Sequence, residues 1–398
     1  MKAGHFFRPA REEFIKMPEG SRLFMLPDRV PVGYDAQTGS FLEMDGYFAV
    51  AAFVAPAYTG TYSSAYQVPL PGKGEGRVRV LPLFCYTAAA FYKGDVYVTA
   101  IRVDRSSRHD PRFIDLKLVR KNSAKIKKLF PSNRLIGHLA DCALIHGCPG
   151  AQNFFLSREE CPLPVSSRCN ASCAGCISCQ KSKDIPATQP RIRFTPSPEE
   201  VRDVALFHAR RVKNPVLSFG QGCEGEPLLE AGLIEKSIRL IRNDTKGATI
   251  NMNTNASKPE LVARLFDAGL DSIRVSINSV RETYYNRYYI PRDYKFKHAL
   301  KSIKIAKRKK GFVSINYLTM PGFTDSRDES AALRKFIETY KIDMIQWRNL
   351  NFDPLHYFKI IKHPVQPSDM IGIRQLISSL KKSFPSLKMG YYNPRLII

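Results

Sequence analysis

The stretch PLPVSSRCNASCAGC, residues 162–176, joins a strand-like segment to a closely spaced group of cysteines. Its first six residues are apolar or β-prone and predict a strand. The following residues bring Cys169, Cys173 and Cys176 into one short loop, which can turn three thiolates toward a single centre. Thiolates favour zinc, copper(I) or an iron–sulfur cluster over hard cations. The stretch therefore predicts a metal site directly after a strand.

The offsets of these cysteines leave two kinds of metal site open. A structural zinc site usually takes two pairs of ligands from separated segments, because one tight loop rarely completes a tetrahedron. The sequence offers no well-placed second pair. A four-iron cluster has corners spread widely enough for short-spaced thiolates to reach, so it is favoured. The loop is expected to enter a helix, with Cys179 one turn into it.

From this stretch onward, short strands alternate with longer helical patterns. The expected strands after 162–167 are residues 215–219, 248–254, 271–277, 312–318 and 343–349. Residues 197–200, Ser-Pro-Glu-Glu, begin one helix with a capping box and a proline at its first position. Six strands, each followed by a helix, predict an α/β fold with a parallel sheet or partial barrel. In such folds, chemistry gathers at the carboxyl ends of the strands.

The rest of the chain divides around this core. Residues 1–155 contain short β-prone runs and two helical patterns, at 113–130 and 132–145, and predict a smaller β-rich α+β module. Ser132 is the expected N-cap of the second helix. The core is expected to span 156–360, and residues 361–398 to form a C-terminal helix and tail.

Net charge and cysteine content indicate which partners and which cellular compartment are expected for the protein. The formal net charge is +25, which suits a polyanionic partner such as RNA but equally a generally basic surface. The sequence contains no apolar run of about 18 residues and begins without the apolar segment of a signal peptide. A cytoplasmic protein without a membrane span is expected, with its nine cysteines reduced.

The CxxxCxxC pattern after a first strand resembles the radical S-adenosylmethionine (SAM) superfamily. Residues 225–227, Gly-Glu-Pro within FGQGCEGEP, are similar to that family's Gly-Gly-Glu-Pro element and follow the second expected strand. The resemblance covers about residues 160–350. It implies a partial (β/α)6 TIM-like barrel that binds a [4Fe–4S] cluster and SAM. Cys169, Cys173 and Cys176 would ligate three irons and leave the fourth to SAM, with Cys179 a bystander.

The resemblance also implies the residues that contact SAM. Glu226 would pair with the SAM ammonium. The full expected set is Gly225, Glu226, Pro227, Asn255, Ser276, Asn316 and Arg348. Arg348 shares a strand face with Gln346, where it would hold the SAM carboxylate or an anionic substrate, whereas Trp347 would face outward and pack.

Two departures from the family pattern affect the site. Gly175 stands where the family usually has an aromatic residue, so the cover over cluster and adenine is expected to be built differently. Glu224 replaces the first glycine of the Gly-Gly-Glu-Pro element, and it could face a substrate or solvent. The catalytic residues are unknown, with Cys223 and Glu224 as candidates.

A second cluster is a further possibility, because several cysteines lie outside the CxxxCxxC loop. Its expected ligands are Cys142, Cys148 and Cys161, completed by Cys179 or His146. The alternative is that these cysteines simply pack in the interior, as free cysteine often does.

The resemblance implies an enzyme in which the reduced cluster cleaves SAM to a 5′-deoxyadenosyl radical that abstracts hydrogen from a substrate. A flavodoxin-like or ferredoxin-like donor would supply the electron. The substrate is unknown; the basic charge and the extra N-terminal module slightly favour RNA or a peptide. The alternatives are a radical SAM enzyme acting on a small metabolite, or a non-enzymatic iron–sulfur or zinc-binding protein.

Overall fold

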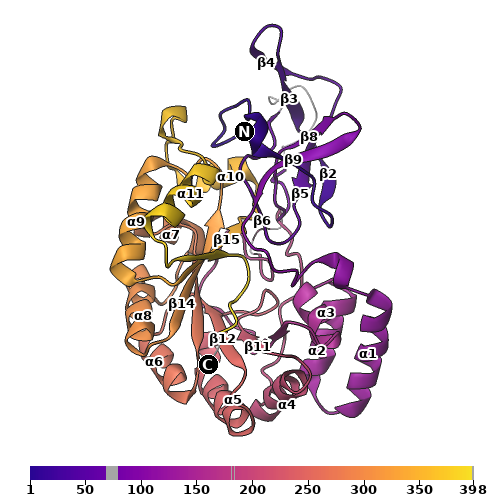
Figure 1. The fold of residues 1–398 in the computed structure, drawn as a ribbon, viewed down its shortest axis with the longest axis vertical. Helices are drawn as coiled ribbons and strands as arrows, with labels where there is room; N and C mark the ends of the chain where they lie inside the picture. The colour runs from indigo at the N-terminus through magenta and orange to yellow at the C-terminus, as the bar shows by residue number, and fades with distance from the viewer. Residues whose placement is uncertain (69–78, 181, 183, 397–398) are drawn as a thin grey trace.

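A computed structural model describes residues 1–68, 79–180, 182 and 184–396. Its main body is a curled parallel sheet whose outer side is lined with helices (Figure 1). An N-terminal β-rich part lies beside one end of this sheet, and three helices that follow it lie beside the sheet's first strands (Figure 1). The expected α/β fold, a partial barrel with a smaller N-terminal module, is confirmed.

The sheet has seven parallel strands in sequential order. They are β10 (Glu160–Pro162), β11 (Val216–Phe219), β12 (Thr249–Thr254), β13 (Ser272–Ile277), β14 (Phe312–Thr319), β15 (Met344–Asn349) and β16 (Lys388–Gly390). The last five of the six expected strands agree to within one residue at each end. The first is shorter and starts earlier than 162–167, and β16 is an additional strand contributed by the segment expected to be a helix and tail.

Helices connect the strands of this sheet. They are α4 (Pro198–Ala209), α5 (Ala231–Asp244), α6 (Pro259–Ala268), α7 (Glu282–Tyr289), α8 (Phe296–Arg308), α9 (Arg327–Tyr340), α10 (Pro354–Ile361) and α11 (Ile373–Ser383), with short 3-10 turns η3 (Pro227–Glu230) and η4 (Pro367–Asp369). The capping box of α4 is confirmed: the Glu200 N–H donates to Ser197 Oγ over 3.2 Å, and the Ser197 N–H donates to the Glu200 carboxylate over 2.8 Å.

The two faces of the sheet differ in polarity because side chains alternate along each strand. One face carries buried apolar residues such as Ile250, Val275 and Trp347. The other is polar: on it Arg274 of β13 donates across β14 to Gln346 Oε1 of β15 over 2.9 Å. Side chains two strands apart meet in this way on the concave side of a curled sheet. The interior of the partial barrel is therefore polar.

The segment after β10 does not enter a helix as expected. Among the described residues between β10 and α4, none is helical. The segment instead folds back on itself, where the Thr188 N–H donates to the Ile177 carbonyl over 2.9 Å. Cys179 lies in this irregular segment and is exposed.

The N-terminal part contains three small sheets and three α-helices. The antiparallel strands are β1 (Phe14–Lys16), β6 (Tyr58–Gly60), β8 (Ala89–Tyr92) and β9 (Asp95–Arg102) in one sheet, β2 (Arg22–Leu26) and β5 (Ala49–Phe53) in another, and β3 (Val30–Asp35), β4 (Ser40–Glu43) and β7 (Tyr66–Gln67) in the third. The helices are α1 (Leu116–Leu129), α2 (Arg134–Leu144) and α3 (Pro149–Phe155), with short turns η1 (Arg11–Glu13) and η2 (Pro111–Phe113). Helix α3 was not expected, and the N-cap of α2 is Asn133 rather than Ser132.

The N-terminal part is bound to the carboxyl end of β15. Thr59 Oγ1 donates to the Trp347 carbonyl, and the Gly60 N–H donates to Asn349 Oδ1, each over 2.8 Å. Asn349 Nδ2 in turn donates to the Tyr58 carbonyl over 2.9 Å. The β6 strand therefore lies at the end of the barrel where polar strand ends gather.

Side chains also join the first strand of the sheet to the segment after the last. Arg108 Nη1 donates to Glu160 Oε2 over 3.0 Å and to the Asn393 carbonyl over 2.8 Å. Asn393 Nδ2 donates to Glu160 Oε1 over 2.6 Å. These contacts connect the two edges of the partial barrel. Within the described ranges, none of the helices combines the length and apolar character needed to span a bilayer.

Candidate functional site

The segment that carries Cys169, Cys173 and Cys176, here called the cysteine loop, is hydrogen-bonded to the loop that follows β11. The Gly225 N–H donates to the Ser166 carbonyl over 2.7 Å, and the Glu226 N–H donates to the Arg168 carbonyl over 2.8 Å. A Cβ atom on Gly225 would lie 1.9 Å from the Arg168 carbonyl oxygen. Glycine is therefore required at this position, because the two backbones pair at a distance that no side chain allows.

The three cysteines of the loop are partly exposed and lie close to one another. Burial raises the pKa of Cys169 to about 11 and that of Cys173 well above its usual range, with the neighbouring thiols adding to both shifts. Arg191 Nη2 lies 3.5 Å from Cys176 Sγ, and Gln180 Nε2 donates to the Cys176 carbonyl over 2.7 Å. The three predicted metal ligands thus share one loop after the carboxyl end of β10.

Glu226 is buried beside this loop with its carboxylate directed at the end of β12. Its Oε2 accepts from the Asn255 N–H over 2.8 Å, and its Oε1 accepts from the Leu228 N–H over 3.1 Å and from Thr254 Oγ1. Burial raises the pKa of Glu226 to about 7. A carboxylate oxygen can accept two hydrogen bonds, so Oε2 keeps one position for a further donor.

Glu224 has a different role from the one considered in the sequence. Its Oε2 accepts from the backbone N–H groups of Val165 and Ser166, and its Oε1 accepts from those of Gly220 and Gln221, over 2.6–3.0 Å. These four bonds fill the positions of both oxygens. Glu224 therefore fastens the segment after β10 to the one after β11, and the idea that it faces a substrate or solvent is corrected.

The side chain of Asn255 also helps to position the cysteine loop through hydrogen bonds. Its Nδ2 donates to Asn170 Oδ1 over 2.7 Å, and its Oδ1 accepts from the Ser257 N–H over 3.0 Å. Asn170 donates in turn to Asp293 Oδ1 over 2.7 Å. Sequence reasoning missed Asn170 and Asp293. The only available signal was the position of Asn170 directly beside Cys169.

The other predicted SAM contacts share the polar interior face of the sheet. The strand register pairs Ser276 with Asn316 and Asn316 with Gln346. Asn316 Oδ1 is buried without a hydrogen-bond partner. Arg348 donates to the Tyr391 carbonyl over 3.1 Å and stacks 4.0 Å from the Tyr391 ring. Trp347 is fully buried against Tyr317, as predicted for a packing residue.

Arg274 is an interior residue that sequence reasoning missed. It lies on β13 two positions before Ser276 and therefore on the same face. Burial and the charge of Arg348 lower the pKa of Arg274 to about 9, which still leaves it charged at neutral pH. The alternation in DSIRVSI was the signal that could have identified it.

Comparison with known proteins bears directly on this arrangement. Residues 163–333 match the family model described as the Radical SAM superfamily. This part of the chain is a radical SAM domain. The matched residues contain the cysteine loop, the Gly-Glu-Pro element and the polar strand ends, so the resemblance seen in the sequence is confirmed. No curated protein matches the chain significantly.

Solved structures similar to this chain share little sequence with it. Native anSMEcpe with bound AdoMet is 15% identical over 48% of this chain and 52% of its own, with a TM-score of 0.36. Methylornithine synthase is 12% identical over 71% and 76%, with a TM-score of 0.41. The FeFe-hydrogenase maturase HydG from Carboxydothermus hydrogenoformans is 14% identical over 71% and 80%, with a TM-score of 0.39. The chain thus spans about half the length of the first of these structures.

The residues present fit the two cofactors of radical SAM enzymes, a [4Fe–4S] cluster and SAM. The three partly exposed thiols lie in one loop that backbone hydrogen bonds hold in place, which suits a cluster with an open iron. The buried Glu226 carboxylate retains an acceptor position, and Asn316 Oδ1 lacks a partner inside the barrel. A buried polar atom without a partner is costly, so the interior suits a polar ligand.

Aromatic side chains from other segments pack against Gly175, where the family pattern has an aromatic residue. A Cβ atom on Gly175 would lie 2.6 Å from Tyr288 Oη and 3.2 Å from the Phe352 ring. Tyr288 belongs to α7, whose residues Tyr285, Tyr288 and Tyr289 are all buried. The space beside Gly175 is therefore filled by aromatic rings from α7 and the segment after β15.

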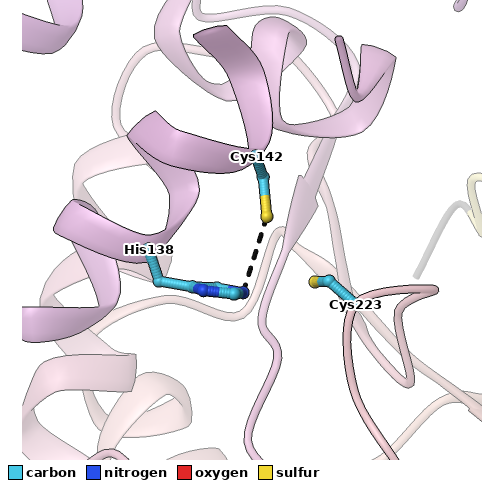
Figure 2. A group of neighbouring side chains, drawn as sticks. All are labelled: His138, Cys142 and Cys223. Atoms are coloured by element: carbon cyan, nitrogen blue, oxygen red, sulfur yellow. Dashed lines mark hydrogen bonds between the residues drawn. The ribbon is translucent and has the colours of Figure 1, made fainter. Parts of the chain in front are cut away.

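The cysteines considered for a second cluster in this radical SAM protein are not grouped as expected. Cys142 on α2 lies beside His138 and Cys223 instead (Figure 2). Cys223, a catalytic candidate from the sequence, is buried and points toward Cys142 of α2 (Figure 2). Cys161 is fully buried on β10, and His146 is exposed.

Proposed function

We propose that the chain is an enzyme that holds a [4Fe–4S] cluster on Cys169, Cys173 and Cys176 and SAM against Glu226. With both bound, these cofactors would supply one-electron cleavage of SAM to methionine and a 5′-deoxyadenosyl radical, the species that would take hydrogen from a substrate. One observation supports this proposal most: the Glu226 carboxylate is buried beside the cysteine loop. That loop is fixed by backbone hydrogen bonds and lies at the carboxyl end of the parallel sheet.

The chain's own residues position the reactants and exclude water. Gly225 lets the Gly-Glu-Pro segment approach the cysteine loop, and the burial of Pro227 keeps that segment fixed. Ser276 and Asn316 offer polar contacts to the SAM nucleoside, and the guanidinium of Arg348 offers one to its carboxylate. Tyr288 and Phe352 shield the cysteine loop from solvent.

The cysteine assignment is tested by single alanine variants reconstituted anaerobically with iron and sulfide. Cys169→Ala, Cys173→Ala and Cys176→Ala are each expected to lose the cluster absorbance and most of the bound iron, whereas Cys179→Ala is expected to keep both. Incubation of the wild type with dithionite and SAM is expected to release 5′-deoxyadenosine. A loaded cluster without this product, or cluster loss only in Cys179→Ala, would contradict the proposal.

The favoured substrate class is a macromolecule, RNA or a peptide. The net charge of +25 supports a polyanion, and the N-terminal part bound at the end of β15 provides a surface beside the barrel mouth. A gel-shift assay with tRNA tests the RNA form. Binding that survives ~200 mM salt supports it, whereas binding lost at that salt reflects nonspecific attraction alone.

A small anionic metabolite is the second candidate, favoured by Arg274 and Arg348 inside the barrel. A large substrate need not reach these interior guanidinium groups. Arg274→Gln is therefore expected to raise the KM for a small anionic substrate by at least about 10-fold, since each charged hydrogen bond contributes ~1.5–3 kcal/mol. An unchanged KM would leave the macromolecular substrate favoured.

The proposed electron donor is a flavodoxin-like or ferredoxin-like protein, and the proposed location is the cytoplasm. The basic charge of the chain supports attraction of an acidic donor. All nine cysteines are free, which agrees with a reducing compartment.

A further inference from the structure

A second group of metal-binding side chains lies outside the SAM site. His138 and Cys142 stand one turn apart on α2 and therefore on the same helix face. Cys223 approaches them from the loop after β11 (Figure 2). Their ligand atoms, one nitrogen and two sulfurs, all lie within 4.8 Å of one another. The Nε2 atom of His138 is 3.5 Å from Cys142 Sγ.

These spacings suit one metal ion better than an iron–sulfur cluster. Around a tetrahedral zinc ion, with bonds of ~2.3 Å to sulfur and ~2.0 Å to nitrogen, neighbouring ligand atoms lie about 3.5–3.8 Å apart. The group needs only small side-chain shifts to reach that geometry. Thiolates of a four-iron cluster each bind a different iron and are held farther apart. Two sulfurs and an imidazole are also a ligand set that zinc prefers.

The charge and burial of the group agree with a divalent ion. Cys142 is 3% exposed and Cys223 is 5% exposed, so an isolated thiolate at either position would be costly. Two thiolates and a neutral imidazole around a dication carry no net charge, and the two thiol protons leave to solvent. Binding to one dication thus avoids the free-energy cost of burying an uncompensated thiolate at either cysteine.

The fourth coordination position has access to solvent. A cleft of about 450 Å³ is lined by residues 134–146 and 190–194, including His138 and Cys142. Arg191 lies in the wall of this cleft and also reaches Cys176 Sγ at 3.5 Å. The cleft thus gives an ion a route to His138 and Cys142 and leaves room for a bound water. Three protein ligands with an open position characterise the catalytic rather than the structural type of zinc site.

We propose that His138, Cys142 and Cys223 form a mononuclear zinc site, separate from the cysteine loop and with its fourth position open to the cleft. The ion would join α2 to the loop that continues directly into Glu224 and Glu226. The site would therefore couple the helices that precede the barrel to the segment that carries the SAM carboxylate. It does not depend on the proposed radical chemistry, because it shares no ligand with the cysteine loop.

The test uses a full-length triple variant, Cys169→Ala/Cys173→Ala/Cys176→Ala, which lacks the cluster ligands. After incubation with Zn²⁺ and desalting, it is expected to retain about one zinc per chain. Co²⁺ in place of Zn²⁺ is expected to give the visible bands of tetrahedral cobalt with sulfur-to-cobalt charge transfer. Adding Cys142→Ser or Cys223→Ser is expected to abolish both signals, whereas adding Cys179→Ala, an exposed cysteine, is expected to change neither.

His138→Gln provides the same test where a serine variant fails to fold, because His138 is only half-buried on a helix surface. It is expected to lower zinc affinity at least about 10-fold, because loss of even an outer-shell partner of a metal ligand typically costs about 10- to 100-fold. Zinc content that is independent of these three residues would overturn the proposal. So would iron and sulfide bound at them in the triple variant, or a Cys142–Cys223 disulfide in anaerobically purified protein. Loss of 5′-deoxyadenosine formation alone would count against the proposed function and not against this site.

Discussion

Glu224 and Glu226 stand two positions apart in one loop and are both buried, yet their surroundings give them opposite roles. Glu224 accepts four backbone hydrogen bonds, from the segments that follow β10 and β11, whereas Glu226 retains an acceptor position near the cysteines. Burial raises the pKa of both to about 7. The hydrogen-bond partners, and not the degree of burial, separate the two residues.

This difference predicts distinct effects of the same substitution. Glu226→Gln is expected to weaken SAM binding about 10- to 100-fold, because a charged hydrogen bond worth ~1.5–3 kcal/mol is lost. Glu224→Gln is expected to lower the free energy of unfolding by roughly 1–3 kcal/mol, because an amide nitrogen cannot accept from backbone N–H groups. Calorimetric SAM titration and denaturant unfolding measure the two effects. Weaker SAM binding in a stable Glu224→Gln protein would contradict this division of roles.

The motif identified Glu226 from the sequence, but the function of Glu224 could not be read there. Its four donors come from residues 165–166 and 220–221, and only the folded backbone brings these together. The zinc-site ligands present the same difficulty. His138 and Cys142 have helical spacing, but Cys223 lies about eighty positions later, so only the packing of α2 against the β11 loop joins them.

At the scale of elements, the strands were predicted well because each buried strand combines an apolar face with β-branched residues. The exceptions have physical reasons. Strand β16 has only three residues and lacks an apolar run of its own, so its place depends on pairing with β15. The helix expected around Cys179 is absent from the described residues because this segment folds back on Thr188 and is held there by hydrogen bonds.

The cysteine loop and the Gly-Glu-Pro segment pair so closely that we predict no residue with a side chain can replace Gly225 without loss of stability. Gly225→Ala is expected to separate the two backbones, lower the free energy of unfolding by roughly 1–3 kcal/mol and prevent cluster binding. Gly232→Ala on α5 is the matched control. A Cβ atom there meets nothing within 4 Å, and alanine in a helix is favoured by up to ~1 kcal/mol. Iron content and unfolding measure both variants, and equal stability of the two would contradict the steric argument.

At the scale of the whole molecule, buried histidines make the free energy of unfolding depend on pH. His208 packs on Phe154, donates through Nε2 to the Glu159 carbonyl at 3.3 Å, and has Nδ1 buried without a partner. Burial lowers its pKa to about 4, and that of His109 to about 3. Both histidines are therefore neutral in the folded protein under conditions where an unfolded chain binds protons.

This depressed pKa predicts acid destabilisation with a definite window. Above about pH 6.5 His208 is neutral in both states and costs nothing. As the pH falls from 6.5 toward 4, only the unfolded state gains a proton, so stability falls, by about 2 kcal/mol at pH 5 for this residue. His208→Gln, which keeps an N–H donor, is expected to remove that part of the loss. Denaturant unfolding at pH 7.5 and 5.0 tests it, and an identical loss in variant and wild type would refute the assignment.

The contact between Glu160 and Asn393 has a consequence for the order of events during synthesis. Glu160 belongs to the first strand of the sheet, and Asn393 follows the last, so the ribosome makes one partner only after all seven strands. Until that point Glu160 and Arg108 lack the amide group that joins the sheet edges. A nascent chain therefore presents a sheet whose first strand is not yet joined to the segment after its last strand. Closure of the barrel edges is thus a late event, which follows synthesis of the whole sheet.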